Sequence, residues 1–216
     1  MQYLVASAFY GIDLRLASDA LVQDLVPDVH FKKVFKPWYP VTFFKSHYFP
    51  RQEYRKVVYL VRDGRDAMVS YLHYLEGVSG RPLDFLKLVQ DEKPPFPGNW
   101  HEHVEQWLSN PYNARMIVVR YEDLQQDPVA QLRRIADLAG FGHDEEMLEK
   151  GARAATFEAM KRREAIFPWE NPETPRDRPF VRRGKVGSHE DEMPAEARDA
   201  FMREARSAMK RAGYLS

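Results

Sequence analysis

Three short apolar runs, each rich in β-branched or aromatic residues, constrain the fold of this chain most strongly. They lie far apart in the sequence, at residues 41–44, 57–61 and 116–119. None of them alternates between apolar and polar residues, which is typical of strands buried on both faces of a parallel sheet. Helical patterns separate and follow the runs, at 65–75, 99–108, 128–139 and 194–212. Strands that alternate with helices predict a layered α/β/α fold with a mostly parallel central sheet.

The segments outside these patterns predict further helices and long loops. Residues 1–11 and 18–26 have the composition of helices, the second of which ends before Pro27. Two proline-rich stretches, at 77–98 and 167–179, predict long loops within the same core. Because 216 residues without repeats suit one core, we expect a single domain over the whole chain.

The composition excludes several classes of protein. Equal numbers of basic and acidic residues, 32 of each, disfavour a nucleic-acid-binding protein. The absence of cysteine excludes a thiolate nucleophile and a Cys-ligated metal, and it is consistent with a cytoplasmic protein. The apolar segment at 1–12 is shorter than the ~20 residues of a membrane span. His101 and His103 are the best metal candidates, and we interpret them as part of a solvated helix face, so no metal site is predicted.

Basic and proton-transferring side chains follow the three apolar runs. Lys45 and His47 follow the first run, Arg62 follows the second, and Arg120 and Tyr121 follow the third. Ligands of parallel sheets bind beyond the carboxyl ends of the strands, so this set indicates a site for an anion with one group that moves a proton near pH 7. The same residues also have a structural interpretation, in which His47 is an ordinary loop histidine and Arg62-Asp63 only caps a helix.

The segment at 57–75, VVYLVRDGRDAMVSYLHYL, resembles a family signature. It is similar to the 3′-phosphate-binding motif of the sulfotransferases that use 3′-phosphoadenosine 5′-phosphosulfate (PAPS). In that motif a strand ends in Arg-Asp-x-Arg/Lys-Asp, and Ser-Tyr follows about two helical turns later. The resemblance implies that Arg62 and Ser70 contact the 3′-phosphate.

Four further segments resemble motifs of the same family, in the same order. Lys45-Ser46-His47 is similar to Lys-Thr-His, which implies that His47 is the catalytic base and that Lys45 lies near the transferred group. The other three imply contacts with the nucleotide: Tyr121 with the adenine, Thr156 and Phe157 along the nucleotide, and Arg182, Arg183 and Gly184 with the 3′-phosphate.

The resemblance implies a P-loop nucleoside triphosphate hydrolase-like fold and a metal-free sulfotransferase. Its co-substrate would be PAPS, and its acceptor would be a hydroxyl or amine of a small molecule or glycan, bound from the loops at 77–98 and 167–179. The motifs leave a homodimer open.

The chain departs from the family pattern at two places. Gly187-Ser188-His189 stands where the family has Gly-Asp-Trp or Gly-Gly-Trp, which leaves open how the basic loop docks. The family also begins with a strand and a Lys-Ser-Gly-type loop that binds the 5′-phosphate. Residues 1–4 are similar to the helix after that loop, so we expect a chain that is N-terminally truncated and lacks the first strand.

Two other functions are alternatives to a sulfotransferase on the basis of the sequence. A P-loop nucleotide kinase is disfavoured because neither a Walker loop nor a magnesium-holding acid is evident. A non-catalytic fragment that retains only the phosphate pocket is the second alternative. The apolar positions of the last helical pattern, which we expect to pack on the core, are Phe201, Ala205, Ala208, Met209 and Ala212.

Overall fold

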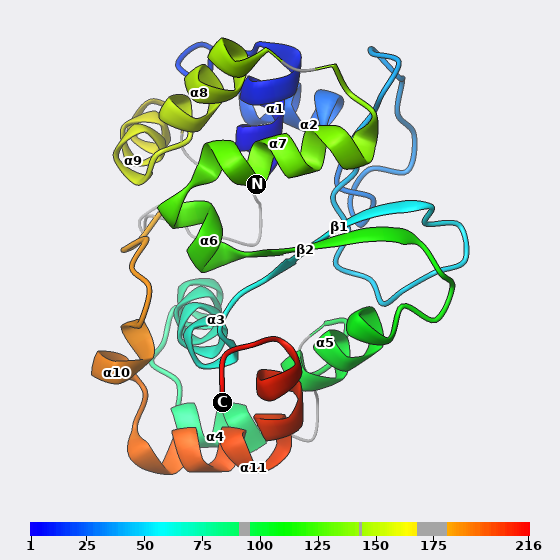
Figure 1. Cartoon of the computed structure of the whole chain (residues 1–216). Coiled ribbons are helices and arrows are strands. Elements are labelled where there is room, and N and C mark those ends of the chain that lie inside the picture. Colours follow the sequence, from blue (N-terminus) through cyan, green and yellow to red (C-terminus); the bar gives the residue numbers. More distant parts are fainter. Residues whose placement is uncertain (91–95, 143, 168–180) are drawn as a thin grey trace. The chain divides into compact units, whose positions relative to one another are not determined.

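The computed structural model describes residues 1–90, 96–142, 144–167 and 181–216, which are mostly helical and include one pair of strands (Figure 1). The described residues divide into two units. Unit 1 comprises residues 1–47, 123–142, 144–167 and 181–184, and unit 2 comprises residues 48–90, 96–122 and 185–216. The expectation of a single domain stays a prediction.

Unit 1 consists of helices that pack around α1 and α8. Its elements are α1 (Gln2–Tyr10), α2 (Asp19–Leu25), α7 (Pro128–Ala139), α8 (Glu145–Ala154) and α9 (Phe157–Ile166), and α6 (Tyr121–Gln126) leads into it. α1 packs against α8 and α2, and α7 packs against α8. The helices predicted at 1–11 and 18–26 are confirmed, the second with the Ser18 side chain accepting a hydrogen bond from the backbone N–H of Leu21.

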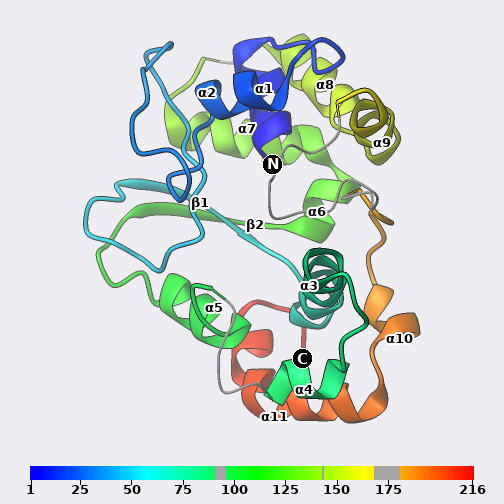
Figure 2. The same cartoon turned by 180° about the vertical axis from the view of Figure 1, so that it is seen from behind.

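Unit 2 contains the sheet. β1 (Lys56–Val61) and β2 (Arg115–Arg120) pair in parallel, with Val57 opposite Met116 and Val61 opposite Arg120. The two strands lie side by side in both views (Figures 1 and 2). The parallel pairing of the runs at 57–61 and 116–119 is thus confirmed. In the described part of the chain the sheet has these two strands alone. The layered α/β/α arrangement around a larger sheet stays a prediction.

The helices of unit 2 form its core with the strands. They are α3 (Gly64–Ser79), α4 (Phe85–Gln90), α5 (Trp100–Ser109), α10 (Ser188–Glu192) and α11 (Ala195–Arg211). α11 packs against α3, α4 and α5, and its apolar positions are buried as predicted, with Ala212 half-buried at its end. Gly64 lies so close to α11 that a Cβ atom there would be 2.5 Å from Cζ of Phe201. Position 64, the first residue of α3, therefore has no room for a side chain.

The strand predicted at 41–44 is wrong. The run packs on α1 instead: the Tyr10 hydroxyl donates to the carbonyl of Val41 (3.0 Å) and accepts from the N–H of Phe43 (3.1 Å). The Phe43 ring also stacks on Phe9, with 5.1 Å between ring centroids. Lys45 alone makes a parallel bridge, with Asp28. The run is apolar because its side chains cover a helix, and its backbone bonds to a side chain rather than to a neighbouring strand.

The stretch at 77–98 is only partly a loop, which corrects a second expectation. It contains α4, whose Phe85 is buried in the core of unit 2. Pro82 lies before α4 and no proline lies within Phe85–Gln90, so the apolar residues of this short helix are uninterrupted. Residues 91–95, and most of the predicted loop at 167–179, lie outside the described residues.

Candidate functional site

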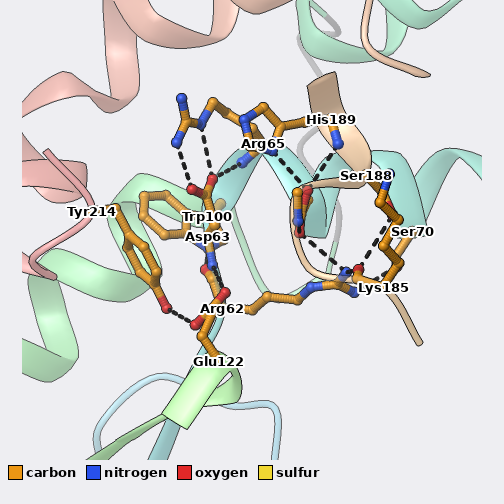
Figure 3. Close-up of polar contacts among 12 residues, drawn as sticks. Arg62, Asp63, Arg65, Ser70, Trp100, Glu122, Lys185, Ser188, His189 and Tyr214 are labelled. Carbon is orange, nitrogen blue, oxygen red and sulfur yellow. Dashed lines mark hydrogen bonds and ion pairs between the residues drawn. The ribbon is translucent and has the colours of Figure 1, made fainter. Parts of the chain in front are cut away.

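Arg62 follows β1 and donates hydrogen bonds to three acceptors (Figure 3). Its Nη1 donates to Oγ of Ser70 (2.9 Å), and its Nη2 donates to the carbonyl of Lys185 (3.0 Å). Nη2 also lies 3.4 Å from Oδ2 of Asp66. Arg62 and Ser70, which the motif predicts at one site, are thus in direct contact.

The turn that carries Arg62 is fixed by its neighbours. The Asp63 carboxylate accepts from the backbone N–H of Arg65 (2.9 Å), which caps α3, and from the Arg65 guanidinium (2.6 Å). The backbone N–H of Asp63 donates to Glu122 (3.1 Å). Trp100 Nε1 donates to the carbonyl of Arg62 (3.2 Å). Asp63 is therefore a helix cap, as the structural interpretation of the sequence has it, and that cap holds Arg62 in place.

Glu122 also joins this turn to the end of the chain. Its second carboxylate oxygen accepts from the hydroxyl of Tyr214 (2.8 Å), and the Arg120 guanidinium lies 4.4 Å from the centre of the Tyr214 ring. Burial, together with the hydrogen bond to Glu122, raises the pKa of Tyr214, so this hydroxyl keeps its proton. The neutral Tyr214 hydroxyl therefore donates to the Glu122 carboxylate and so stabilises the turn.

Asp66 is a wholly buried carboxylate beside Arg62. Its Oδ2 accepts from the backbone N–H of Gly187 (2.8 Å), and its Oδ1 accepts from the backbone N–H of His189 (2.9 Å) and from Nδ1 of the same histidine (2.8 Å). Burial acts to raise the pKa of Asp66, but the hydrogen bonds of His189 and Gly187 and the charge of Arg62 outweigh it and lower the pKa. The carboxylate is therefore ionised, and it holds the segment after Gly184 to α3.

The Arg62 site retains capacity to bind an anion. Nε of Arg62 is buried and has no acceptor among the described residues. Ser70 is exposed, and its Oγ accepts from Arg62, so the hydroxyl can donate its hydrogen to a further group. The predicted site residue Tyr121 places its ring 4.6 Å from the Arg62 guanidinium. A guanidinium held in this way can present a fixed set of donors to a phosphate or sulfate.

The two predicted catalytic residues lie in unit 1. Lys45 Nζ lies 2.8 Å from Oδ2 of Asp28, a wholly buried carboxylate. His47 is exposed, two residues further along the chain. Their roles as charge stabiliser and base stay predictions.

The remaining predicted nucleotide-contacting residues also lie in unit 1. Thr156 caps α9 by accepting from the N–H of Ala159 (3.3 Å). Phe157 is half-buried against Gly184, where a Cβ atom would be 2.4 Å from Cδ2 of the ring. Gly184 has a φ of 60°, which residues with a side chain rarely adopt. Both this backbone conformation and the close approach of the Phe157 ring therefore require glycine here. Arg182 is half-buried and Arg183 is exposed in the same segment.

The sequence interpretation missed Asp66, Glu122 and His189 as parts of the site. Asp66 is the last residue of the Arg-Asp-Gly-Arg-Asp motif, so its place two positions after Gly64 was available as a signal. His189 carries no such signal, because it stands where the family pattern has tryptophan. Its contact with Asp66 holds the segment Lys185–His189 against α3.

The interpretation of His103 as part of a solvated helix face is wrong. Its Nδ1 lies 3.1 Å from the Tyr59 hydroxyl, and its Nε2 accepts from Nε1 of Trp107 (3.2 Å). The ring is half-buried among aromatic side chains, because α5 turns this face toward the strands. Over the residues that the structure describes, no three His, Asp or Glu side chains group as a metal site requires.

None of the described helices is both long enough and apolar enough to cross a bilayer.

This chain is similar in sequence to sulfotransferases. A family model described as "Sulfotransferase domain" matches residues 19–213. Rat sulfotransferase 1E1 is 26% identical over 163 residues, which are 72% of this chain and 55% of the relative. Human sulfotransferase 2B1 is 27% identical over 193 residues, 86% of this chain and 52% of the relative. The chain therefore spans about half the length of the curated relatives that it matches.

Two solved structures share the fold. Mouse sulfotransferase SULT7A1, complexed with PAP, matches 74% of this chain and 63% of its own, at a TM-score of 0.58 and 23% identity. Retinol dehydratase, in complex with androsterone and the inactive cofactor PAP, matches 82% of this chain and 55% of its own, at a TM-score of 0.66 and 23% identity. Since the family model covers most of the sequence, this chain belongs to the sulfotransferase domain family.

Proposed function

We propose that this chain binds PAPS and transfers its sulfuryl group to a hydroxyl or amine of a small-molecule or glycan acceptor. The contact of Arg62 with Ser70 carries the proposal, because these two residues occupy the positions of the family's 3′-phosphate motif and lie 2.9 Å apart. Family membership and the fold of relatives solved with PAP support it further. The layered sheet of a P-loop protein is part of the same proposal.

The 3′-phosphate fits the Arg62 site on grounds of donor chemistry. The buried Nε of Arg62, which has no acceptor in the described part of the chain, would gain one from a phosphate oxygen. The Ser70 hydroxyl would donate to a second oxygen. Asp66 does not oppose binding strongly, because N–H groups of Gly187 and His189 already stabilise its charge. In the proposal Arg182, Arg183 and Gly184 add further phosphate contacts, and Tyr121, Thr156 and Phe157 contact the rest of the nucleotide.

His47 and Lys45 would act on the transfer itself, for which bound PAPS supplies the sulfuryl group. The His47 imidazole would accept the proton of the acceptor hydroxyl or amine, since histidine changes charge near neutral pH. The Lys45 ammonium would stabilise negative charge that develops on oxygen. Asp28 holds that ammonium here, so a sulfuryl oxygen would compete with a carboxylate for it.

Titration calorimetry with PAP tests the proposal. We expect the wild-type chain to bind PAP and R62A to bind it at least about tenfold more weakly, because charge-assisted hydrogen bonds to the phosphate are lost. R115A is the matched control, since Arg115 begins β2 at the opposite end of the strand pair. Equal affinities of R62A and the wild type would refute the assignment of Arg62.

A protein that binds the nucleotide without transferring sulfate is the second candidate. The ion pair of Lys45 with Asp28 favours it, because the pair engages the ammonium that catalysis requires. An assay with PAPS and a panel of phenol, alcohol and amine acceptors separates the two. If the chain binds PAP but releases no PAP from PAPS with any acceptor of the panel, the binding-only function is established.

A further inference from the structure

The segment Lys185–His189 and the first turns of α3 are joined by one buried carboxylate. Asp66 accepts two backbone N–H groups of this segment, those of Gly187 and His189, and the ring N–H of His189. The same segment presents the Lys185 carbonyl to Nη2 of Arg62 (3.0 Å). The position of that carbonyl therefore depends on how the segment docks on Asp66.

His189 makes the one contact from a side chain of this segment to Asp66 among the described residues. The ring is well buried, with 11% of the side chain exposed, and Nδ1 lies 2.8 Å from Oδ1. Since an ionised carboxylate can only accept, Nδ1 carries the hydrogen whether the ring is neutral or charged. The ring thus restrains the segment beyond what its two backbone bonds achieve.

We propose that His189 is a positioning residue for Arg62: through Asp66 it holds Lys185–His189 against α3 and so fixes the carbonyl that orients the guanidinium. The proposal rests on the proposed function, in which that guanidinium binds the 3′-phosphate. His189 does not touch the nucleotide in this scheme. Its effect reaches the phosphate through the Lys185 carbonyl and through Asp66, which both contact Nη2 of Arg62.

Three variants separate positioning from general stability. H189L removes the donor, H189A removes it without added volume, and H189N keeps an N–H donor near the place of Nδ1. H73L is the matched control, because His73 Nε2 lies 2.8 Å from Glu192 and also joins α3 to α10 without contacting Arg62 or Asp66.

Calorimetry compares two probes, PAP and adenosine 5′-phosphate, which lacks the 3′-phosphate. We expect H189L and H189A to bind PAP about tenfold more weakly, the loss of one hydrogen bond to a charged group, and to bind adenosine 5′-phosphate as the wild type does. H189N should stay within about threefold of the wild type, and H73L should equal it. This pattern would not arise from lost stability, which would weaken both nucleotides.

Four results would contradict the positioning role of His189. Unchanged PAP affinity of H189L and H189A, equal losses in H73L, or parallel losses for both nucleotides would overturn the positioning role. So would loss of cooperative unfolding in both H189L and H189A, because His189 would then be needed for folding.

Failure of the proposed function gives a different result. If the wild type binds neither nucleotide, that function is refuted, and amide hydrogen exchange decides the positioning role alone. The amides of Gly187 and His189 should exchange about tenfold faster in H189L than in the wild type. Equal exchange rates would overturn the inference.

Discussion

At the scale of the residue, the site depends on how each charge is compensated. Arg62 is held by a hydroxyl, a carbonyl and a carboxylate, and that carboxylate is held by three N–H donors. Removing one member leaves a buried charge with too few partners, which costs more than the contact itself contributes. Asp66 is the member with the largest number of such contacts.

Replacing Asp66 with asparagine should lower the free energy of unfolding by about 3 kcal/mol at pH 7, because an amide N–H₂ would face the donors of Gly187 or His189. The pKa of Asp66 is lowered in the folded chain, so its contribution is fully present above the unfolded pKa of about 3.9 and is lost as the pH falls through the folded value. The difference between D66N and the wild type should therefore shrink below about pH 4.

Urea unfolding at several pH values measures this difference. D199N is the control, because Asp199 is exposed and pairs only with Arg198 at 3.6 Å among the described contacts. Its effect should stay below about 0.5 kcal/mol. A D66N difference that is independent of pH between 3 and 7 would contradict the ionised state assigned to Asp66.

At the scale of the element, the sequence predicted strands and helices where local pattern and packing agree. The paired runs at 57–61 and 116–119 have strand partners, whereas the run at 41–44 has the same composition and packs on α1. Composition cannot distinguish a strand from an apolar segment that covers a helix, since only the backbone partner differs. The same limit applies to His103, whose burial depends on which face α5 turns toward Tyr59.

Helix α3 offers a test in which one substitution has opposite effects at two positions. G64A should destabilise the chain by about 1–3 kcal/mol, because the new Cβ would lie 2.5 Å from Phe201 and 2.7 Å from Trp100. G77A, in the same helix, should stabilise it by about 0.5–1 kcal/mol, since nothing lies within 4 Å of its Cβ and alanine is the better helix former. Thermal unfolding of both variants measures the difference, and the same sign for both would contradict the packing described here.

At the scale of the whole molecule, a net charge of zero conceals local charge. The sequence predicted Arg62 and Ser70 at one site because a known motif fixes their spacing, and they are in contact. It could not predict the docking of His189 on Asp66, which joins residues 123 positions apart. Contacts of that separation follow from the fold and leave no local pattern in a single sequence.

The proposed activity assigns nucleotide binding and chemistry to different residues, so the two should respond to different substitutions. H47A should lower sulfuryl transfer from PAPS by a factor of about 10²–10⁴, the usual contribution of a general base, and leave PAP affinity within about twofold. R62A should instead weaken PAP binding, because Arg62 lies in unit 2 beside Ser70. Transfer assays at saturating PAPS, combined with calorimetry, measure both quantities for each variant. An H47A variant that retains most of its turnover would remove His47 from the mechanism, and an H47A variant that loses PAP affinity would make it a binding residue. Only the separation of the two effects supports a base that acts on the acceptor while Arg62 holds the nucleotide.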